Sequence, residues 1–325
     1  MDQVRSATRR RPPTGARQRS GASRCLIAAL VACLAASAQL PAQVSMSAPG
    51  PSSPDPEATA WAAETGRLIY EKDLAAARAT DLLLSRLGSE RDARLRGWIT
   101  VRSGEHWIAR FVGETAEGLV ALYDVAVTPA GGDVTRHDPP PALSEREASM
   151  FRARQAAAEA LPYYCSEDYN TVVVDGENGH WLVYLLAATR TPNLAVAGGH
   201  FRIEVAPTGE EVVAAYPLSD GCLEMSLEPP PGALMPTGLV LTHTLSGAPV
   251  ETHTYLSLLH DLPIHVLTEG GVWEVDGATT EPVDCSTASG DACSRWVAAR
   301  DRGAFGGDPD DGAAGVAEPR TGDEG

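Results

Sequence analysis

The 325-residue chain has few basic residues and almost no lysine. It contains 26 Lys and Arg against 43 Asp and Glu, a formal net charge of −17, and its single lysine is Lys72. Nucleic-acid binding needs clustered cations to neutralise phosphates, so this balance argues against a nucleic-acid partner. Hydrophobic residues make up 43% of the chain. That share is too high for a wholly disordered chain, and the mean hydropathy of −0.14 is too low for a multi-span membrane protein.

Several motifs that carry chemistry are also missing. The chain has no G-x-S-x-G nucleophile elbow, no phosphate-binding G-x-x-x-x-G-K-[ST] loop and no H-E-x-x-H zinc motif. No cysteine pair has the C-x₂₋₄-C spacing of a zinc site. The sequence therefore predicts no cofactor.

Residues 1–38 have the form of a secretory signal peptide. A segment with seven arginines comes first, and the apolar run CLIAALVACLAA follows at 25–36. Residues 36–38 (ASA) supply an A-x-A cleavage site. The run is shorter than the roughly 20 residues that span a bilayer. We therefore expect an exported protein, periplasmic or secreted.

A second processing route is open at the same place. Residues 30–33 read LVAC, the pattern of a bacterial lipobox, in which Cys33 would be lipidated. The protein would then be anchored to the envelope by that lipid. Contact with a membrane is expected only through the leader or through such a lipid.

Four cysteines remain after the leader, an even number that favours disulfides in an exported chain. Four cysteines allow three pairings. The favoured pairs are Cys165–Cys222 and Cys285–Cys293, because the second pair encloses only STASGDA, a short polar loop that bends easily.

The rest of the chain divides into a Pro/Ser-rich linker at 39–57, a first module at 58–137, a second at 138–300 and a disordered acidic tail at 301–325. In the first module, apolar residues at helical spacing predict a helix from Trp61 to near Gly88. Strands are predicted at 94–103, 106–113 and 119–128. The acidic pairs Glu64 with Glu71 and Asp73 with Asp81 are expected on a solvated helix face.

The second module repeats this plan. Ser144 with Glu147 forms a capping box that starts a helix, and Pro162 ends it. Strands are predicted at 170–175, 180–189, 200–205 and 211–218, and further strands at 239–246, 251–260, 263–268 and 272–277. The last group either extends the second sheet or forms a third. The predicted fold class is α+β, with two modules of a helix on an antiparallel sheet, the second extended by C-terminal strands.

Histidines gather in the C-terminal strands. Four of the eight fall within 23 residues: His243, His253, His260 and His265. A hairpin turning at 247–249 would place His243 opposite His253, with Glu251 on the same face as His253. Imidazole and carboxylate groups bind metals and transfer protons, so His243, His253 and Glu251 are candidate metal ligands. A structural role is favoured, because His243 shares the parity of the leucines in its strand.

The order helix then antiparallel sheet, twice over in an exported chain, resembles PepSY-like and cystatin-like modules. The stretch GGHFRIEVAPTGEEVVAAYPL (198–218) is similar to their strand–turn–strand portion. The resemblance covers residues 140–220 well and 58–137 loosely. Other stretches, among them GRLIYEKDLAAARATDLLL (66–84), resemble parts of uncharacterised exported bacterial proteins.

The resemblance implies a non-enzymatic protein that inhibits proteases, acts as a pro-region or binds envelope partners. We therefore expect a binding or inhibitory protein whose partner is an unidentified envelope protein or peptide. The alternative is a secreted metal-dependent or acid–base enzyme that uses the region of His243 and His253.

Overall fold

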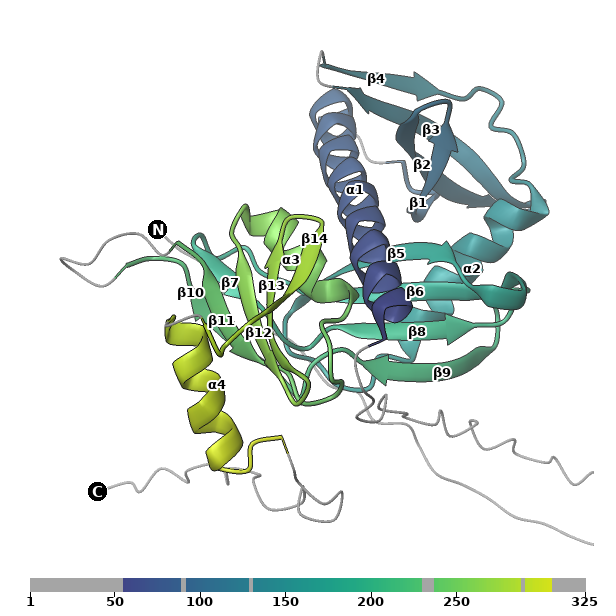
Figure 1. Ribbon diagram of the computed structural model, residues 1–325. Helices are drawn as coiled ribbons and strands as arrows, with labels where there is room; N and C mark the ends of the chain where they lie inside the picture. The colour runs from purple at the N-terminus through teal and green to yellow at the C-terminus, as the bar shows by residue number, and fades with distance from the viewer. Residues whose placement is uncertain (1–54, 89–91, 129–130, 230–236, 288–289, 306–325) are drawn as a thin grey trace, which may run out of the picture. The chain divides into compact units, whose positions relative to one another are not determined.

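The computed structural model describes residues 55–88, 92–128, 131–229, 237–287 and 290–305. In these ranges the chain is a mixed α+β protein, as the sequence predicts, with four α-helices and three four-stranded sheets (Figure 1). The predicted leader with Cys33, the linker up to residue 54 and the tail from residue 306 lie outside the described residues. None of the helices in these ranges combines the length and the hydropathy that a membrane span requires.

The first helix, α1, spans Pro56–Leu87. Asp55 caps its start, because its carboxylate accepts a hydrogen bond from the backbone N–H of Glu57 at 3.0 Å. Pro56 opens the first turn, where its missing N–H breaks no helical hydrogen bond. The helix ends before Gly88, which has φ 57°, in agreement with the predicted end.

The first sheet pairs four antiparallel strands in chain order, β1 to β4. Leu83 of α1 packs in its core against Phe111 and Leu122. The sequence predicts the first three strands but not β4, because its residues GGDVTR contain no apolar run. The strands span Leu95–Ser103, His106–Thr115, Gly118–Thr128 and Gly131–Arg136.

The second module begins with α2 (Glu145–Glu159) at the predicted capping box. The Ser144 hydroxyl accepts from the backbone N–H of Glu147 at 3.3 Å, and the backbone N–H of Ser144 donates to the Glu147 carboxylate at 2.9 Å. An antiparallel sheet in the order β5-β6-β8-β9 follows, so both modules share the order helix, then four strands. The strands span Asp168–Asp175, Trp181–Ala188, Phe201–Val205 and Val212–Pro217, with a 3₁₀ turn at Glu177–Gly179.

The C-terminal strands form a third sheet, one of the two arrangements that the sequence left open. Its order is β11-β12-β13-β14, and only β11 and β12 are parallel. The strands span Leu239–Thr242, Ile264–Thr268, Gly271–Asp276 and Thr279–Val283.

The strand predicted at 251–260 is wrong, because this segment is the helix α3 (Glu251–His260). The helix provides the crossover that a parallel pair of strands requires. Its period is hidden in the sequence, because residues 251–257 are all buried whether they are polar or apolar, so polarity does not mark a solvent-facing side. Four further elements were not predicted: the strands β7 (Leu194–Val196) and β10 (Glu224–Ser226), which pair with each other, the strand β14 and the helix α4 (Asp291–Asp301).

Two disulfides join the pairs that the sequence favoured. Cys165–Cys222 links the segment before β5 to the segment before β10, across 57 residues. Cys285–Cys293 links the end of the third sheet to the first turn of α4, across 8 residues. The covalent links therefore lie at the irregular connections of the second module and of the C-terminal region.

Helix α1 contacts elements on both sides of the predicted boundary at residue 138 (Figure 1). Towards its C-terminal end, Ala79 packs on the first sheet. Nearer its N-terminus, Ile69 belongs to the core shared with the second and third sheets. The Nζ of Lys72 donates a hydrogen bond to the carbonyl of Val173 in β5 at 2.5 Å. Helix α1 therefore packs against all three sheets.

Candidate functional site

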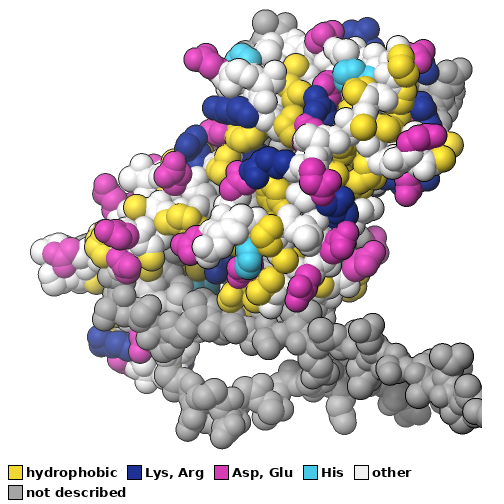
Figure 2. Space-filling view, turned by 90° about the vertical axis from the view of Figure 1, so that its right-hand side faces the viewer, with side chains coloured by type: hydrophobic (Ala, Val, Ile, Leu, Met, Phe, Trp, Pro, Cys, Tyr) yellow, Lys and Arg dark blue, Asp and Glu magenta, His cyan; other side chains and the backbone are white. Residues whose placement is uncertain are grey.

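Charge alone marks no site on the face shown in Figure 2. Acidic and basic side chains are interspersed there, with hydrophobic side chains exposed between them. The net negative charge is therefore not gathered into one patch on this face, and the cavities are the better guide to a site.

The structure brings together two of the predicted site residues, His243 and His253. Their ring centroids lie 4.9 Å apart at an interplanar angle of 85°. His243 follows β11 and His253 lies in the first turn of α3, so the contact arises at a strand–helix connection and not in a hairpin. Both residues line a cavity of about 230 Å³ next to Asp220 and Cys222.

Both imidazoles make local hydrogen bonds. The Nδ1 of His253 accepts from the backbone N–H of Val250 at 2.9 Å and so satisfies a donor at the start of α3. The Nε2 of His243 lies 2.9 Å from the hydroxyl of Ser246. Burial lowers the pKa of His243 to about 4 and that of His253 well below its usual value, so both are neutral at pH 7.

Glu251 is directed to other partners. Its carboxylate pairs with the guanidinium of Arg202 and accepts from the Tyr184 hydroxyl at 2.9 Å. His260, at the end of α3, lines another cavity, and His265 lies in β12 opposite Glu274. Within the part of the chain that the structure describes, no three His, Cys, Asp or Glu side chains are placed to hold one metal ion.

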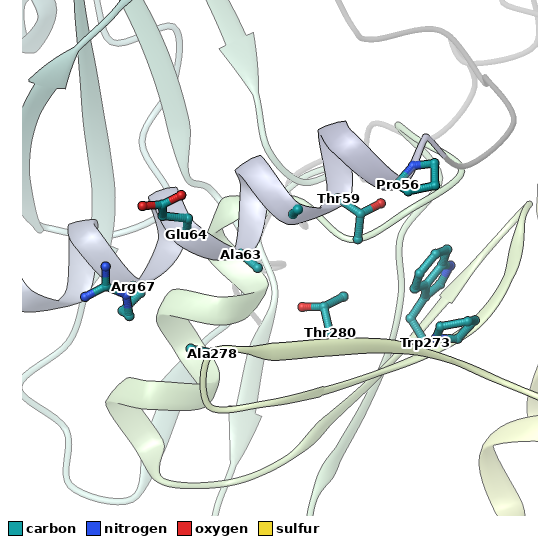
Figure 3. A pocket seen from close by; sticks show the side chains of 10 residues that line it. Pro56, Thr59, Ala63, Glu64, Arg67, Trp273, Ala278 and Thr280 are labelled. Carbon is teal, nitrogen blue, oxygen red and sulfur yellow. The ribbon is translucent and has the colours of Figure 1, made fainter.

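A groove of about 580 Å³ lies between α1 and the hairpin of β13 and β14 (Figure 3). This volume falls within the range of small-molecule sites. Most of its walls are small or apolar side chains, and Glu64 and Arg67 are the charged members. The lining residues are Pro56, Thr59, Ala60, Ala63, Glu64 and Arg67 of α1, and Trp273, Ala278, Thr280 and Pro282 of the hairpin.

The groove exists because small side chains face each other across it. Thr59 and Ala63 point from α1 towards Thr280 on β14 (Figure 3). Pro282 is in register with Trp273, so these two side chains form a flat apolar wall at one end. Arg67 pairs with Glu71 on the same helix, so Glu64, which forms none of the ion pairs among the described residues, leaves one negative charge at the other end.

Two buried donors beside the groove lack partners. The indole N–H of Trp273 and the hydroxyl of Thr280 have no hydrogen-bond partner among the described residues. Buried polar groups are nearly always paired, with protein, water or ligand. The Thr280 hydroxyl can rotate, so an occupant with an acceptor oxygen could pair with it.

A second polar arrangement joins three elements around Asp73 of α1. The Oδ2 of Asp73 accepts from the Tyr255 hydroxyl at 2.9 Å and from the Asn170 amide at 3.2 Å. Burial raises the pKa of the Asp73 carboxyl, and the two hydrogen bonds act in the opposite direction. All three residues line a cavity of about 340 Å³, which His260 also borders.

The sequence does not reveal this arrangement around Asp73. Asp73 was expected on a solvated face, which is wrong, because it is only 8% exposed. A signal was present: Asp73 lies four residues after Ile69 and three before Ala76, in the apolar stripe of the helix. Asn170 and Tyr255 are 97 and 182 residues away from Asp73, so no local pattern could have joined the three.

No protein-family model, no curated protein and no solved structure matches this chain. The resemblance to PepSY-like and cystatin-like modules therefore stays a prediction. The class that the fold defines is a disulfide-linked α+β protein with three antiparallel or mixed sheets around a shared helix.

Proposed function

We propose that this protein is an exported, non-enzymatic binding protein. In this proposal, the groove between α1 and the β13–β14 hairpin receives an apolar group of a partner peptide or protein in the cell envelope. The partner's chain supplies a carbonyl oxygen to the hydroxyl of Thr280. The groove itself is the observation that carries the proposal, because its size and apolar walls are those of a ligand site.

Export is supported by two independent features. The first 38 residues have the charge, hydropathy and cleavage pattern of a signal peptide. The two disulfides suit an oxidising compartment. We propose a periplasmic or secreted location, with attachment to the envelope through Cys33 as the alternative.

The groove can be tested with an uncharged apolar fluorophore, N-phenyl-1-naphthylamine. Ala63→Phe fills the groove from the α1 side, and Ala158→Phe on the exposed face of α2 is the matched control. We expect the fluorescence of the bound dye to fall at least tenfold in Ala63→Phe and to stay unchanged in Ala158→Phe. Equal dye binding in all three proteins would contradict the proposed site.

The partner can be tested in the native envelope. A photoreactive amino acid placed at position 63 or at position 158 should produce a discrete cross-linked species only from position 63. The Ala63→Phe protein without the photoreactive group should compete poorly with wild type for that species. Identical adducts from both positions, or none from position 63, would count against a binding function for the groove.

A further inference from the structure

Asp73 is a buried carboxylate without a cationic partner. Its side chain forms none of the ion pairs among the described residues. Both of its hydrogen bonds come from uncharged donors, the Tyr255 hydroxyl and the Asn170 amide. A buried carboxylate is costly unless it is paired, so a cation that reached Asp73 would be stabilised there.

Two basic side chains adjoin Asp73 in the sequence or in the cavity, and one is engaged elsewhere while the other is neutral. Lys72 directly precedes Asp73 in the sequence, but its Nζ donates to the carbonyl of Val173 and lies 4.8 Å from the centroid of the Trp107 ring. His260 borders the same cavity as Asp73, and burial lowers its pKa, so it is neutral at pH 7. No cation among the described residues therefore pairs with the ionised form of Asp73, and a cation that entered the cavity would supply that charge.

The geometry of the carboxylate selects the kind of cation. Both hydrogen bonds reach Oδ2, which leaves Oδ1 without a hydrogen-bond partner among the described residues. A guanidinium binds best as a fork that uses both oxygens of a carboxylate. An ammonium group acts as a point charge and needs only one oxygen.

The cavity suits a short apolar stem on that ammonium. Its volume is about 340 Å³, and its walls are mainly aliphatic, among them Leu74, Leu194, Val196 and Leu256. The net charge of −17 raises the local concentration of cations around the protein. None of these wall residues lines the groove at β13–β14, so the cavity is a separate site.

We propose that this cavity binds a primary alkylammonium ion, with the ammonium on Oδ1 of Asp73 and the alkyl stem between Leu194 and Leu256. The tyrosine and asparagine on Oδ2 hold the carboxylate in position and remain bound when the ligand enters. A free alkylamine and the lysine side chain of a peptide share this chemistry. This site would give the protein a second ligand, a cation, and it does not depend on the groove between α1 and the β13–β14 hairpin.

The test is an NMR titration of the mature protein, followed at the side-chain amide of Asn170, which donates to Asp73. The probes are n-butylammonium, n-butylguanidinium and 1-butanol at equal concentrations and ionic strength. We expect saturable shifts with n-butylammonium and affinities at least tenfold weaker for the other two. Nα-acetyl-lysine methylamide then distinguishes a free alkylamine from a peptide lysine as the ligand. Only a cavity that is open to peptides accepts the backbone of this compound.

Two variants and one control complete the experiment. Asp73→Asn removes the charge, and Ala77→Phe occludes the cavity from the exposed side of α1. Asp81→Asn makes the same change of charge on an exposed residue of α1. We expect Asp73→Asn and Ala77→Phe to bind n-butylammonium at least tenfold more weakly than wild type. Asp81→Asn should bind it with unchanged affinity. If Asp73→Asn fails to fold, Ala77→Phe decides.

The proposal is overturned if n-butylammonium gives no saturable shift, or if 1-butanol binds as well as the ammonium. Binding that persists unchanged in Ala77→Phe would also overturn it. Tighter binding of n-butylguanidinium than of n-butylammonium would overturn the choice of an ammonium ligand.

Discussion

The hydroxyl of Tyr255 donates a hydrogen bond to Oδ2 of Asp73 at 2.9 Å, which joins α3 to α1 across 182 residues of sequence. Both side chains are buried, and burial together with the Asp73 charge raises the pKa of Tyr255 well above its usual value. The tyrosine therefore stays protonated and remains a donor throughout the physiological range. This hydrogen bond belongs to the network of Asp73, Tyr255 and Asn170 that holds the carboxylate of the proposed cation site in position.

The first prediction concerns that bond. Tyr255→Phe removes the donor and leaves a buried carboxylate with one hydrogen bond fewer. We expect the free energy of unfolding to fall by about 1–3 kcal/mol, measured by urea denaturation followed by circular dichroism. Tyr164→Phe is the control, since Tyr164 is 73% exposed and its loss should change stability little. Equal losses in both variants would contradict the role of the bond.

The second prediction concerns the close approach of α1 and α3 at Gly66. A Cβ added at this position would overlap the carbonyl oxygen of Glu251 and lie 2.7 Å from the Cβ of Thr254. Alanine favours a helix over glycine by about 1 kcal/mol, but overpacking costs about 1–3 kcal/mol. We expect Gly66→Ala to lower the melting temperature in a thermal scan. Gly221→Ala, where an added Cβ meets no atom within 4 Å, should leave it unchanged.

The third prediction concerns pH. The Nδ1 of His200 accepts from the backbone N–H of Ala187 at 3.0 Å, and its Nε2 lies 3.1 Å from the carbonyl of Val196. Only a neutral imidazole protonated on Nε2 makes both bonds. Burial lowers the pKa of His200 to about 4, from 6.5.

The sign of this effect follows from proton binding. Between pH 6.5 and 4 the unfolded chain binds a proton at His200 that the folded chain does not. Stability is therefore full above pH 6.5 and falls as the pH drops towards 4, by about 1.4 kcal/mol per pH unit for each such histidine. His243 and His253 add to the slope, because burial lowers their pKa values too.

Urea denaturation at several pH values between 4.5 and 7.5 measures the slope of the free energy of unfolding against pH. His200→Gln keeps an acceptor and a donor but cannot titrate, so its slope should be shallower by about one proton. A matched change at His106, which is exposed on β2, should leave the slope as it is. An unaltered slope in His200→Gln would show that this histidine is not protonated on unfolding.

The fourth prediction separates the two disulfides. In the chain-entropy model, closing 57 residues through Cys165–Cys222 stabilises by about 4 kcal/mol, and closing 8 residues through Cys285–Cys293 by about 2.5 kcal/mol. Paired Cys→Ala variants should lose stability in that order in guanidinium denaturation. Loss of the second disulfide should also increase proteolysis around α4 more than elsewhere. The reverse order of stability would contradict the loop-length account.

The secondary structure was predictable wherever local chemistry decides it. The capping box at Ser144, the end of α1 before Gly88 and the alternating strands of the first two sheets depend on neighbours in the sequence. Helix α3 was not predictable, because residues 251–257 are buried whether they are polar or apolar, so no periodic polar face distinguishes this helix from a strand. Strand β4 was missed for the opposite reason, since its pairing with β3 rests on the backbone.

The candidate sites were predictable only in part. The proximity of His243 and His253 was expected from the sequence, although a strand–helix connection and not a hairpin produces it. Glu251 was expected beside them and instead pairs with Arg202, which lies 49 residues away. The groove at Trp273 could not be read from the sequence, because its opposite wall is α1, about 200 residues earlier.

The sequence by itself determined the α+β class, most of the helices and strands of the first two sheets, the favoured cysteine pairs and the net negative charge. Hydrophobic periodicity, caps and turns carry that information within a few residues. Only the tertiary structure decided that α1 is shared by three sheets and that Asp73 meets Tyr255 and Asn170. Such contacts depend on how whole elements pack, and packing joins residues whose separation along the chain leaves no local pattern.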